Sequence, residues 1–149
     1  MSKPLIAEKE IILEYNVKII WDIIVNNSDY KWRSDIKNIE ISKNGNDWIE
    51  YYDDNNKFFT KFTLKGKEEC KLYSFDMENK NFSGNWIGKF IKINNNETKC
   101  IFKENIYVKN KIMILLAKIF WDIKKIQEQY LRDLEKKLNE NNSKIKRNK

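Results

Sequence analysis

Glu104 is the side chain with the clearest potential for chemistry. In the segment TKCIFKENIYV, β-strand alternation places Glu104 on the same face as Phe102 and Ile106, and this is the more apolar face. A carboxyl group in an apolar cavity has a raised pKa and can act as a general acid or base, or as a polar anchor for a ligand. Tyr73 or Tyr107 could assist it. The alternatives are that a bulge or the strand end turns Glu104 to solvent, or that it pairs with a lysine or arginine.

The rest of the sequence excludes much enzymology. The chain has no histidine, which excludes Ser-His and Cys-His nucleophiles and histidine-ligated metals. Its four glycines are scattered and form no phosphate-binding loop. Cys70 and Cys100 lie far apart without metal-type spacing, so we interpret them as buried thiols in a reducing compartment. We expect no cofactor and no metal.

A second group of side chains could line an apolar ligand cavity. In FSGNWIGKF, Gly84 and Gly88 alternate with Trp86 on one strand face, where they either make room for a ligand or mark a bend. Core packing is the alternative for each aromatic candidate. The residues predicted to contact a ligand are Trp32, Phe58, Phe62, Leu72, Trp86, Phe90, Phe102, Glu104, Met113, Leu116 and Phe120.

The stretch NSDYKWRSDI interleaves aromatic and basic residues, which are the ingredients of a single-strand nucleic-acid site. The chain also carries a net charge of +7, but residues 139–149 alone contribute four basic residues against one acidic residue. A basic body of this kind attracts polyanions weakly and without specificity. We therefore expect no specific nucleic-acid partner. Instead, Trp32 is predicted to pack inward near a cavity rim, with Lys31 and Arg33 facing water.

The length and charge pattern indicate one domain over residues 1–138, followed by a basic tail, 139–149, that we expect to be disordered. MSKPLIAEKE becomes charged before any apolar signal-peptide region develops, and the longest apolar run is too short for a transmembrane segment. These features predict a cytoplasmic protein.

Hydrophobic periodicity predicts an α+β fold. Residues 8–15 form a first strand, Asn16 caps a short helix over VKIIWDIIV, and Ser28 or Asp29 begins a second, shorter turn or helix, so that two short helices are expected after the first strand. Five turn candidates then separate six strand-like runs; Asn44-Gly45 suits a type I′ hairpin, and Lys65-Gly66-Lys67 is another candidate. From Asn110 a helix of about seven to eight turns follows. Short connections require an antiparallel sheet.

This order of elements predicts a cavity. A curved seven-stranded antiparallel sheet wrapped around a single long C-terminal helix leaves space between the two layers. The first half of that helix is apolar nearly all round, so it must be buried, cover a cavity or meet a partner.

The segment VKIIWDIIVNNSDYKWRSDIKNIEI resembles the N-terminal signature of the START-like, or Bet v 1-like, helix-grip superfamily. Trp21 matches its first-helix tryptophan, and Tyr30 with Trp32 matches the aromatic pair before the second strand. FSGNWIGKF and TKCIFKENI resemble its last two strands, so the likeness covers residues 6–138. Within the superfamily the chain looks most like the bacterial polyketide cyclase/dehydrase and lipid-transport branch.

The resemblance implies a protein that holds an apolar small molecule or lipid in its cavity, for binding, transport or sensing. A cyclase or dehydratase-like enzyme that uses Glu104 is the first alternative, and a regulatory interaction protein is the second. The sequence leaves the ligand and the oligomeric state open.

Overall fold

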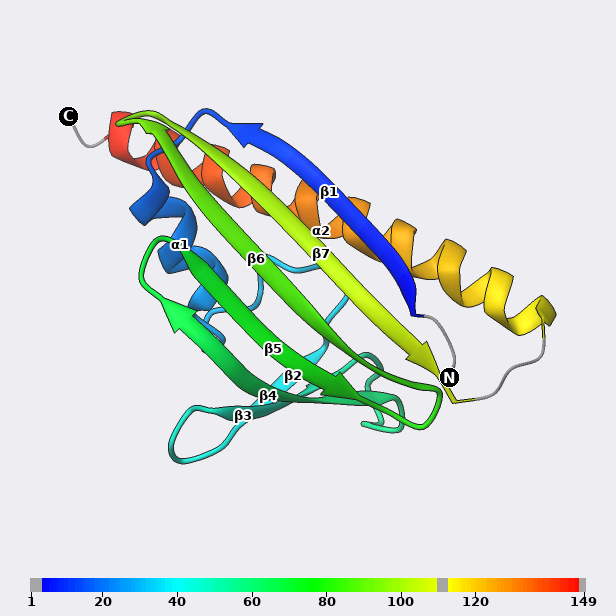
Figure 1. The fold of residues 1–149 in the computed structure, drawn as a ribbon. Helices are drawn as coiled ribbons and strands as arrows, with labels where there is room; N and C mark the ends of the chain where they lie inside the picture. Colours follow the sequence, from blue (N-terminus) through cyan, green and yellow to red (C-terminus); the bar gives the residue numbers. More distant parts are fainter. Residues whose placement is uncertain (1–3, 110–112, 148–149) are drawn as a thin grey trace.

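A computed structural model describes residues 4–109 and 113–147, without the side chains of residues 113–117, 119, 120 and 143–147. One strand and one short helix precede six further strands and a long C-terminal helix (Figure 1). The elements are β1 (Leu5–Leu13), α1 (Val17–Val25), β2 (Asn38–Ile41), β3 (Asp47–Tyr51), β4 (Phe59–Glu68), β5 (Leu72–Glu78), β6 (Phe82–Asn94), β7 (Glu97–Val108) and α2 (Met113–Arg147).

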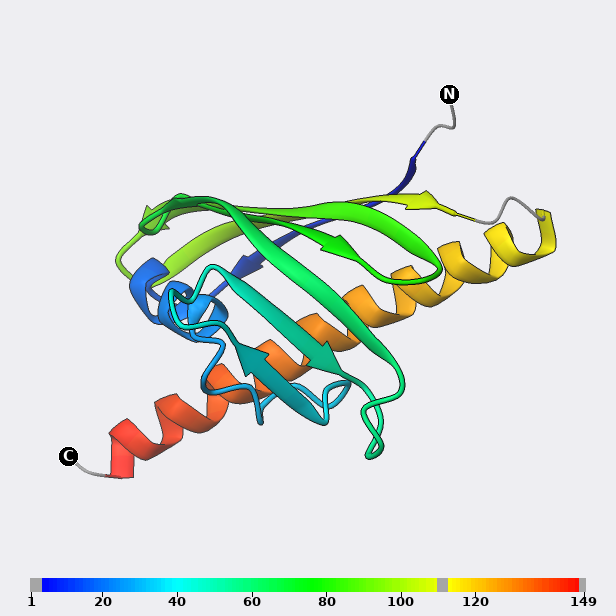
Figure 2. The ribbon, with the colours of Figure 1, turned by 90° about the horizontal axis from the view of Figure 1, so that it is seen from below.

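The seven strands form one antiparallel sheet in the order β1-β7-β6-β5-β4-β3-β2. The sheet curves, and α2 runs across its concave side with α1 beside it (Figure 2). The α+β helix-grip architecture, with a seven-stranded antiparallel sheet around a long C-terminal helix, is therefore confirmed.

Helix α1 begins and packs as its sequence predicts. The side chain of Asn16 accepts a hydrogen bond from the Lys18 backbone N–H at 2.9 Å, which caps the first turn. The buried face repeats at helical spacing and consists of Val17, Ile20, Trp21 and Ile24.

The prediction of a second short helix is wrong. After α1 the chain makes single turns, with the N–H of Asp29 bonded to Asn26 O and that of Arg33 bonded to Tyr30 O. The Ser34 N–H, which a helix would use internally, instead donates to the Asp133 carboxylate of α2 at 2.8 Å. A tertiary partner thus ends the helical pattern in the connection between α1 and β2, residues 26–37, which we call the α1–β2 loop.

Two turn assignments also differ. Of the residues in the Asn44-Gly45 hairpin only Gly45 has a positive φ, at 77°, so the turn is not type I′, which requires two such residues. Asn44 contributes its side chain instead, accepting from the Asn46 N–H. Gly66 lies inside β4, where the register with β5 shifts, and the actual turn places Cys70 at φ 61°. Glycine inside a strand marks a bulge here, as it often does.

Helix α2 buries one face against the sheet. Five buried positions recur every three or four residues: Ile123, Gln127, Leu131, Leu134 and Leu138; the carboxylate of Asp133 is buried as well. The helix continues to Arg147, within the segment for which a disordered tail was predicted. Among the described residues, no helix combines the length and the apolar character needed to cross a membrane.

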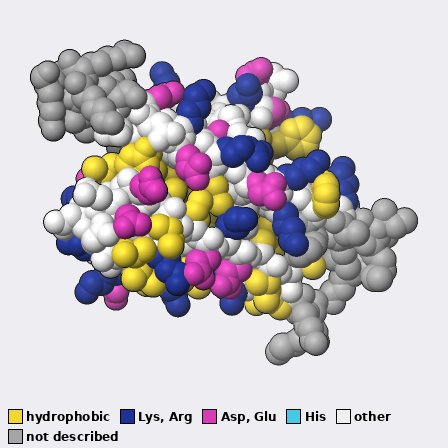
Figure 3. Space-filling model, turned by 90° about the horizontal axis from the view of Figure 1, so that it is seen from above, with side chains coloured by type: hydrophobic (Ala, Val, Ile, Leu, Met, Phe, Trp, Pro, Cys, Tyr) yellow, Lys and Arg dark blue, Asp and Glu magenta, His cyan; other side chains and the backbone are white. Residues whose placement is uncertain are grey.

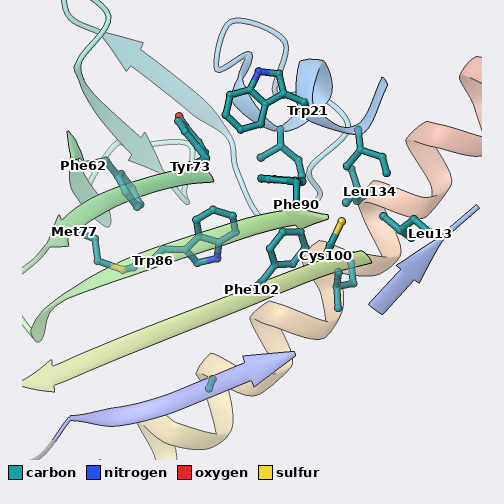
Figure 4. Close-up of a cluster of buried hydrophobic side chains, with 14 of the residues drawn as sticks. Leu13, Trp21, Phe62, Tyr73, Met77, Trp86, Phe90, Cys100, Phe102 and Leu134 are labelled. Atoms are coloured by element: carbon teal, nitrogen blue, oxygen red, sulfur yellow. The ribbon is translucent and has the colours of Figure 1, made fainter. Parts of the chain in front are cut away.

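The hydrophobic core lies where α1, α2 and the long strands meet (Figure 4). Trp21 packs edge-on against Phe90 with ring centroids 5.4 Å apart, so it anchors α1 to the sheet. Cys100 is fully buried, and burial raises the pKa of its thiol to about 12. Cys70 is only half-buried, in the β4–β5 turn, and both cysteines are free. On the outside, basic and acidic side chains intermingle with hydrophobic ones (Figure 3).

Candidate ligand-binding site

A cavity of about 460 Å³ lies between the concave side of the sheet, the α1–β2 loop and α2. This volume falls within the range of small-molecule binding pockets. Among the described residues its lining consists of Ile24, Asn27, Arg33, Asp35, Trp48, Glu50, Tyr52, Thr60, Phe62, Tyr73, Phe75, Met77, Asn81, Phe82, Trp86, Phe102, Glu104, Ile106, Asp122, Ile123, Ile126, Gln127 and Tyr130.

Aromatic side chains form the wall on the sheet side. Trp48 stacks on Phe62 at a centroid distance of 5.4 Å, and Phe75 stacks on Trp86 at 5.1 Å. Each comes from a strand position whose alternation points it to the concave side. The rings are therefore locked by each other and by the sheet, which gives a preformed apolar surface.

The two glycines of β6 serve packing. A Cβ at Gly84 would come within 2.2 Å of the Asn105 carbonyl oxygen on β7, and a Cβ at Gly88 would come within 2.5 Å of the Trp86 ring. The indole thus occupies the space over Gly88. Of the two interpretations of these glycines, the structure supports close packing, because neither opens space for a ligand.

A charged group of Arg33, Asp35 and Glu50, which we call the charged wall, forms another part of the cavity lining. Arg33 of the α1–β2 loop donates to both carboxylate oxygens of Glu50 (3.0 and 3.3 Å) and to both oxygens of Asp35 (2.9 and 3.3 Å). Its guanidinium carbon lies 5.3 Å from the ring centroid of Tyr130 on α2. Arg33 was predicted to face water, and that prediction is wrong because two acidic partners stabilise its charge inside.

Hydrogen bonds also connect the α1–β2 loop, which carries Arg33 of the charged wall, to α2. The Asp133 carboxylate accepts from both the backbone N–H and the hydroxyl of Ser34, each at 2.8 Å. Gln129 donates to the other oxygen of Asp133. These bonds hold the loop next to Arg33 in one position.

Glu104 projects from β7 into the cavity, as alternation predicted. Burial raises its pKa to about 7, while Arg33 opposes this effect and Glu50 and Asp35 reinforce it. No hydrogen bond or ion pair joins Glu104 to another described side chain. It can therefore give or accept a proton, or bind a ligand group, near neutral pH.

Four of the predicted ligand contacts line the cavity: Phe62, Trp86, Phe102 and Glu104. Trp32 lies one layer behind, packed against Tyr130 with ring centroids 5.4 Å apart. Phe90 points inward but is covered by Trp21 of α1. The side chains of Met113, Leu116 and Phe120 lie outside the described residues.

Phe58 and Leu72, two other predicted ligand contacts, are not among the described residues that line the cavity. Phe58 lies in the turn before β4, where its N–H bonds to the Asp53 carboxylate, and its side chain is 50% exposed. Leu72 lies on the outer face of β5, because side chains alternate along a strand and Tyr73 and Met77 occupy the inner face. Similarly, Tyr73 lines the cavity, whereas Tyr107 is exposed on the outside of β7.

The charged wall was not predicted from the sequence, although the sequence holds one signal for it. Glu50 shares strand parity with Trp48, so alternation placed a carboxylate among inward aromatics. A buried ionised carboxylate is usually paired with a cation, and Arg33 is one of only three arginines among 29 basic residues.

No protein-family model matches the chain, and no curated protein matches its sequence. Its structure is similar to a START superfamily protein from Mycobacterium smegmatis, with 12% identity over 91% of this chain and 97% of that chain and a TM-score of 0.74. It is also similar to the Zhui aromatase/cyclase from Streptomyces sp. R1128 (10% identity, 89% and 92% covered, TM-score 0.67).

A third similar structure is norcoclaurine synthase from Thalictrum flavum in complex with dopamine and hydroxybenzaldehyde (10% identity, 91% and 86% covered, TM-score 0.68). The chain therefore has the START/Bet v 1-like helix-grip fold, as the resemblance implied.

Proposed function

We propose that this protein binds an apolar small molecule or lipid in the cavity between the sheet and α2. The observation that carries the proposal is a cavity of about 460 Å³ walled by interlocked aromatic rings. Preformed, mostly apolar cavities with a few convergent polar groups are the usual form of a small-molecule site. The fold is compatible with this role, since the norcoclaurine synthase of similar structure was determined with two small aromatic molecules. A cytoplasmic location and a single domain over residues 1–138 stay predictions.

A matched pair of tryptophan substitutions on β5 tests the proposal. Met77→Trp fills the cavity from the inner face, whereas Leu72→Trp places the same side chain on the outer face. Native mass spectrometry and solvent extraction of the purified protein should find a co-purifying apolar molecule in the wild type and in Leu72→Trp. The Met77→Trp variant should lose it. Equal retention by both variants would contradict binding in this cavity.

A cyclase or dehydratase-like enzyme is the second candidate function. The observation that favours it is Glu104, whose pKa of about 7 suits a general acid or base and whose carboxyl group faces the cavity that Tyr73 also lines. A compound found to bind would be incubated with wild type and with Glu104→Gln, and conversion followed by mass spectrometry. Conversion that persists in Glu104→Gln would remove Glu104 from the reaction.

A further inference from the structure

The charge of the cavity is opposite to that of the chain. The protein carries a net charge of +7 with 29 lysines and arginines, yet the described lining contains no lysine. Its charged members are one cation, Arg33, and four carboxylates: Asp35, Glu50, Glu104 and Asp122. With every carboxylate ionised the described lining would have a net charge of −3, and with Glu104 protonated it would have −2.

Arg33, the single cation of the described lining, is already paired with two carboxylates. Arg33 donates four hydrogen bonds to Glu50 and Asp35, which together carry one more negative charge than Arg33 can neutralise. A guanidinium has five N–H donors, so little capacity is left for an anionic ligand. An incoming carboxylate would also be repelled by the acidic side chains around it.

The carboxylate of Glu104 can accept a hydrogen bond from a ligand. It projects into the cavity and makes no hydrogen bond or ion pair with another described side chain. Trp86 is its neighbour on β6, and Phe102 lies two residues earlier on the same face of β7. The Trp86 ring stacks on Phe75 and Phe102, and the Tyr130 ring already carries the Arg33 guanidinium, so these rings supply an apolar wall that excludes water. An unpaired carboxylate against such a wall, in a described lining whose one cation is already paired, is suited to a desolvated ammonium group.

We propose that the ligand is an amphiphilic amine, with its protonated nitrogen at Glu104 and its apolar body against the aromatic wall. This inference rests on the proposed function, because it assigns a head group to the ligand of the same cavity. It separates amines from fatty acids and other apolar carboxylic acids, which share the apolar body but carry the opposite charge.

Two matched series of probes test the head group. One series is 2-naphthylmethylamine, 2-naphthylmethanol and 2-naphthoic acid, and the other is decylamine, decanol and decanoic acid, each below its aggregation concentration. Binding at pH 8 is followed by tryptophan fluorescence, since Trp48 and Trp86 line the cavity, and by calorimetry. In each series we expect the amine to bind about tenfold or more tightly than the acid, which corresponds to one charge-assisted contact.

Variants assign the preference to Glu104. In Glu104→Gln the amine should lose about tenfold in affinity while the alcohol changes little. The control is Glu8→Gln, an exposed carboxylate on the neighbouring strand β1, which should bind all probes like wild type. An acid or alcohol that binds as tightly as its amine, or an amine preference unchanged in Glu104→Gln, would overturn the inference and leave the proposed function standing. Failure of all six probes to bind would contradict the proposed function, and the inference with it.

Discussion

At the scale of single residues, Glu104 links the cavity to the stability of the fold. Its pKa is about 7 in the folded protein against an ordinary value of 4.5, and burial is the main cause. The folded state therefore binds more protons than the unfolded state between these two values. The stability that Glu104 contributes is fully present below pH 4.5 and is lost as the pH rises to about 7.

Glu104→Gln should remove this pH dependence. At pH 8 we expect the variant to be more stable than wild type by about 1–3 kcal/mol, because it no longer buries a charge. At pH 4 the two should be nearly equal. Urea denaturation of wild type, Glu104→Gln and the exposed control Glu8→Gln at both pH values measures the difference. A wild-type pH profile in Glu104→Gln would contradict the assigned pKa.

Arg33 is predicted to be the most sensitive polar position. Arg33→Met leaves Glu50 and Asp35 without their cation, and we expect it to cost about 3–5 kcal/mol of unfolding free energy. Arg132→Met, at an exposed position on α2, should change stability by less than about 0.5 kcal/mol. Chemical denaturation distinguishes the two.

The triple variant Arg33→Met/Asp35→Asn/Glu50→Gln separates charge burial from packing. It removes the unpaired carboxylates as well as the cation, so it should recover most of the stability that Arg33→Met loses. A triple variant as unstable as the single one would show that Arg33 acts mainly by packing on Tyr130.

At the scale of elements, the glycines of the sheet differ in what surrounds them. A Cβ at Gly84 meets a backbone oxygen at 2.2 Å, whereas a Cβ at Gly66 meets the Ser74 hydroxyl at 2.8 Å, a side-chain atom that can rotate away. We therefore expect Gly84→Ala to destabilise the protein by more than about 2 kcal/mol and Gly66→Ala by clearly less. Thermal denaturation of the two variants gives the comparison, and equal effects would contradict it.

Periodicity predicted the elements better than their connections. Alternation in β7 placed Phe102 and Glu104 on the concave face, because a strand inside an antiparallel sheet has only two faces. The α1–β2 loop could not be predicted in the same way. Its conformation depends on Asp133, 99 residues from Ser34, and on the Arg33 ion pairs. Leu72 could not be placed from the sequence for another reason: its strand is apolar on both faces at that end.

At the scale of the whole molecule, a positive exterior surrounds an acidic cavity. A cationic ligand is repelled while it diffuses toward a chain of net charge +7 and attracted only inside. Added salt screens the long-range repulsion over about 10 Å at 0.1 M and affects the buried contact less. We therefore predict that the association rate of 2-naphthylmethylamine rises with ionic strength, while that of 2-naphthylmethanol stays constant. Stopped-flow tryptophan fluorescence measures both, and an amine rate that falls with salt would contradict the prediction.

The Arg33 ion pairs also constrain how this protein can evolve. Exchanging one apolar residue of the cavity wall for another of similar volume costs little, so the size and shape of the accepted ligand can drift by single substitutions. Reversing the charge of the charged wall would cost more stability. Arg33, Asp35 and Glu50 stabilise one another, so each single substitution on the way leaves a buried charge unpaired. Descendants of this chain should therefore diversify in the body of their ligands sooner than in the head group.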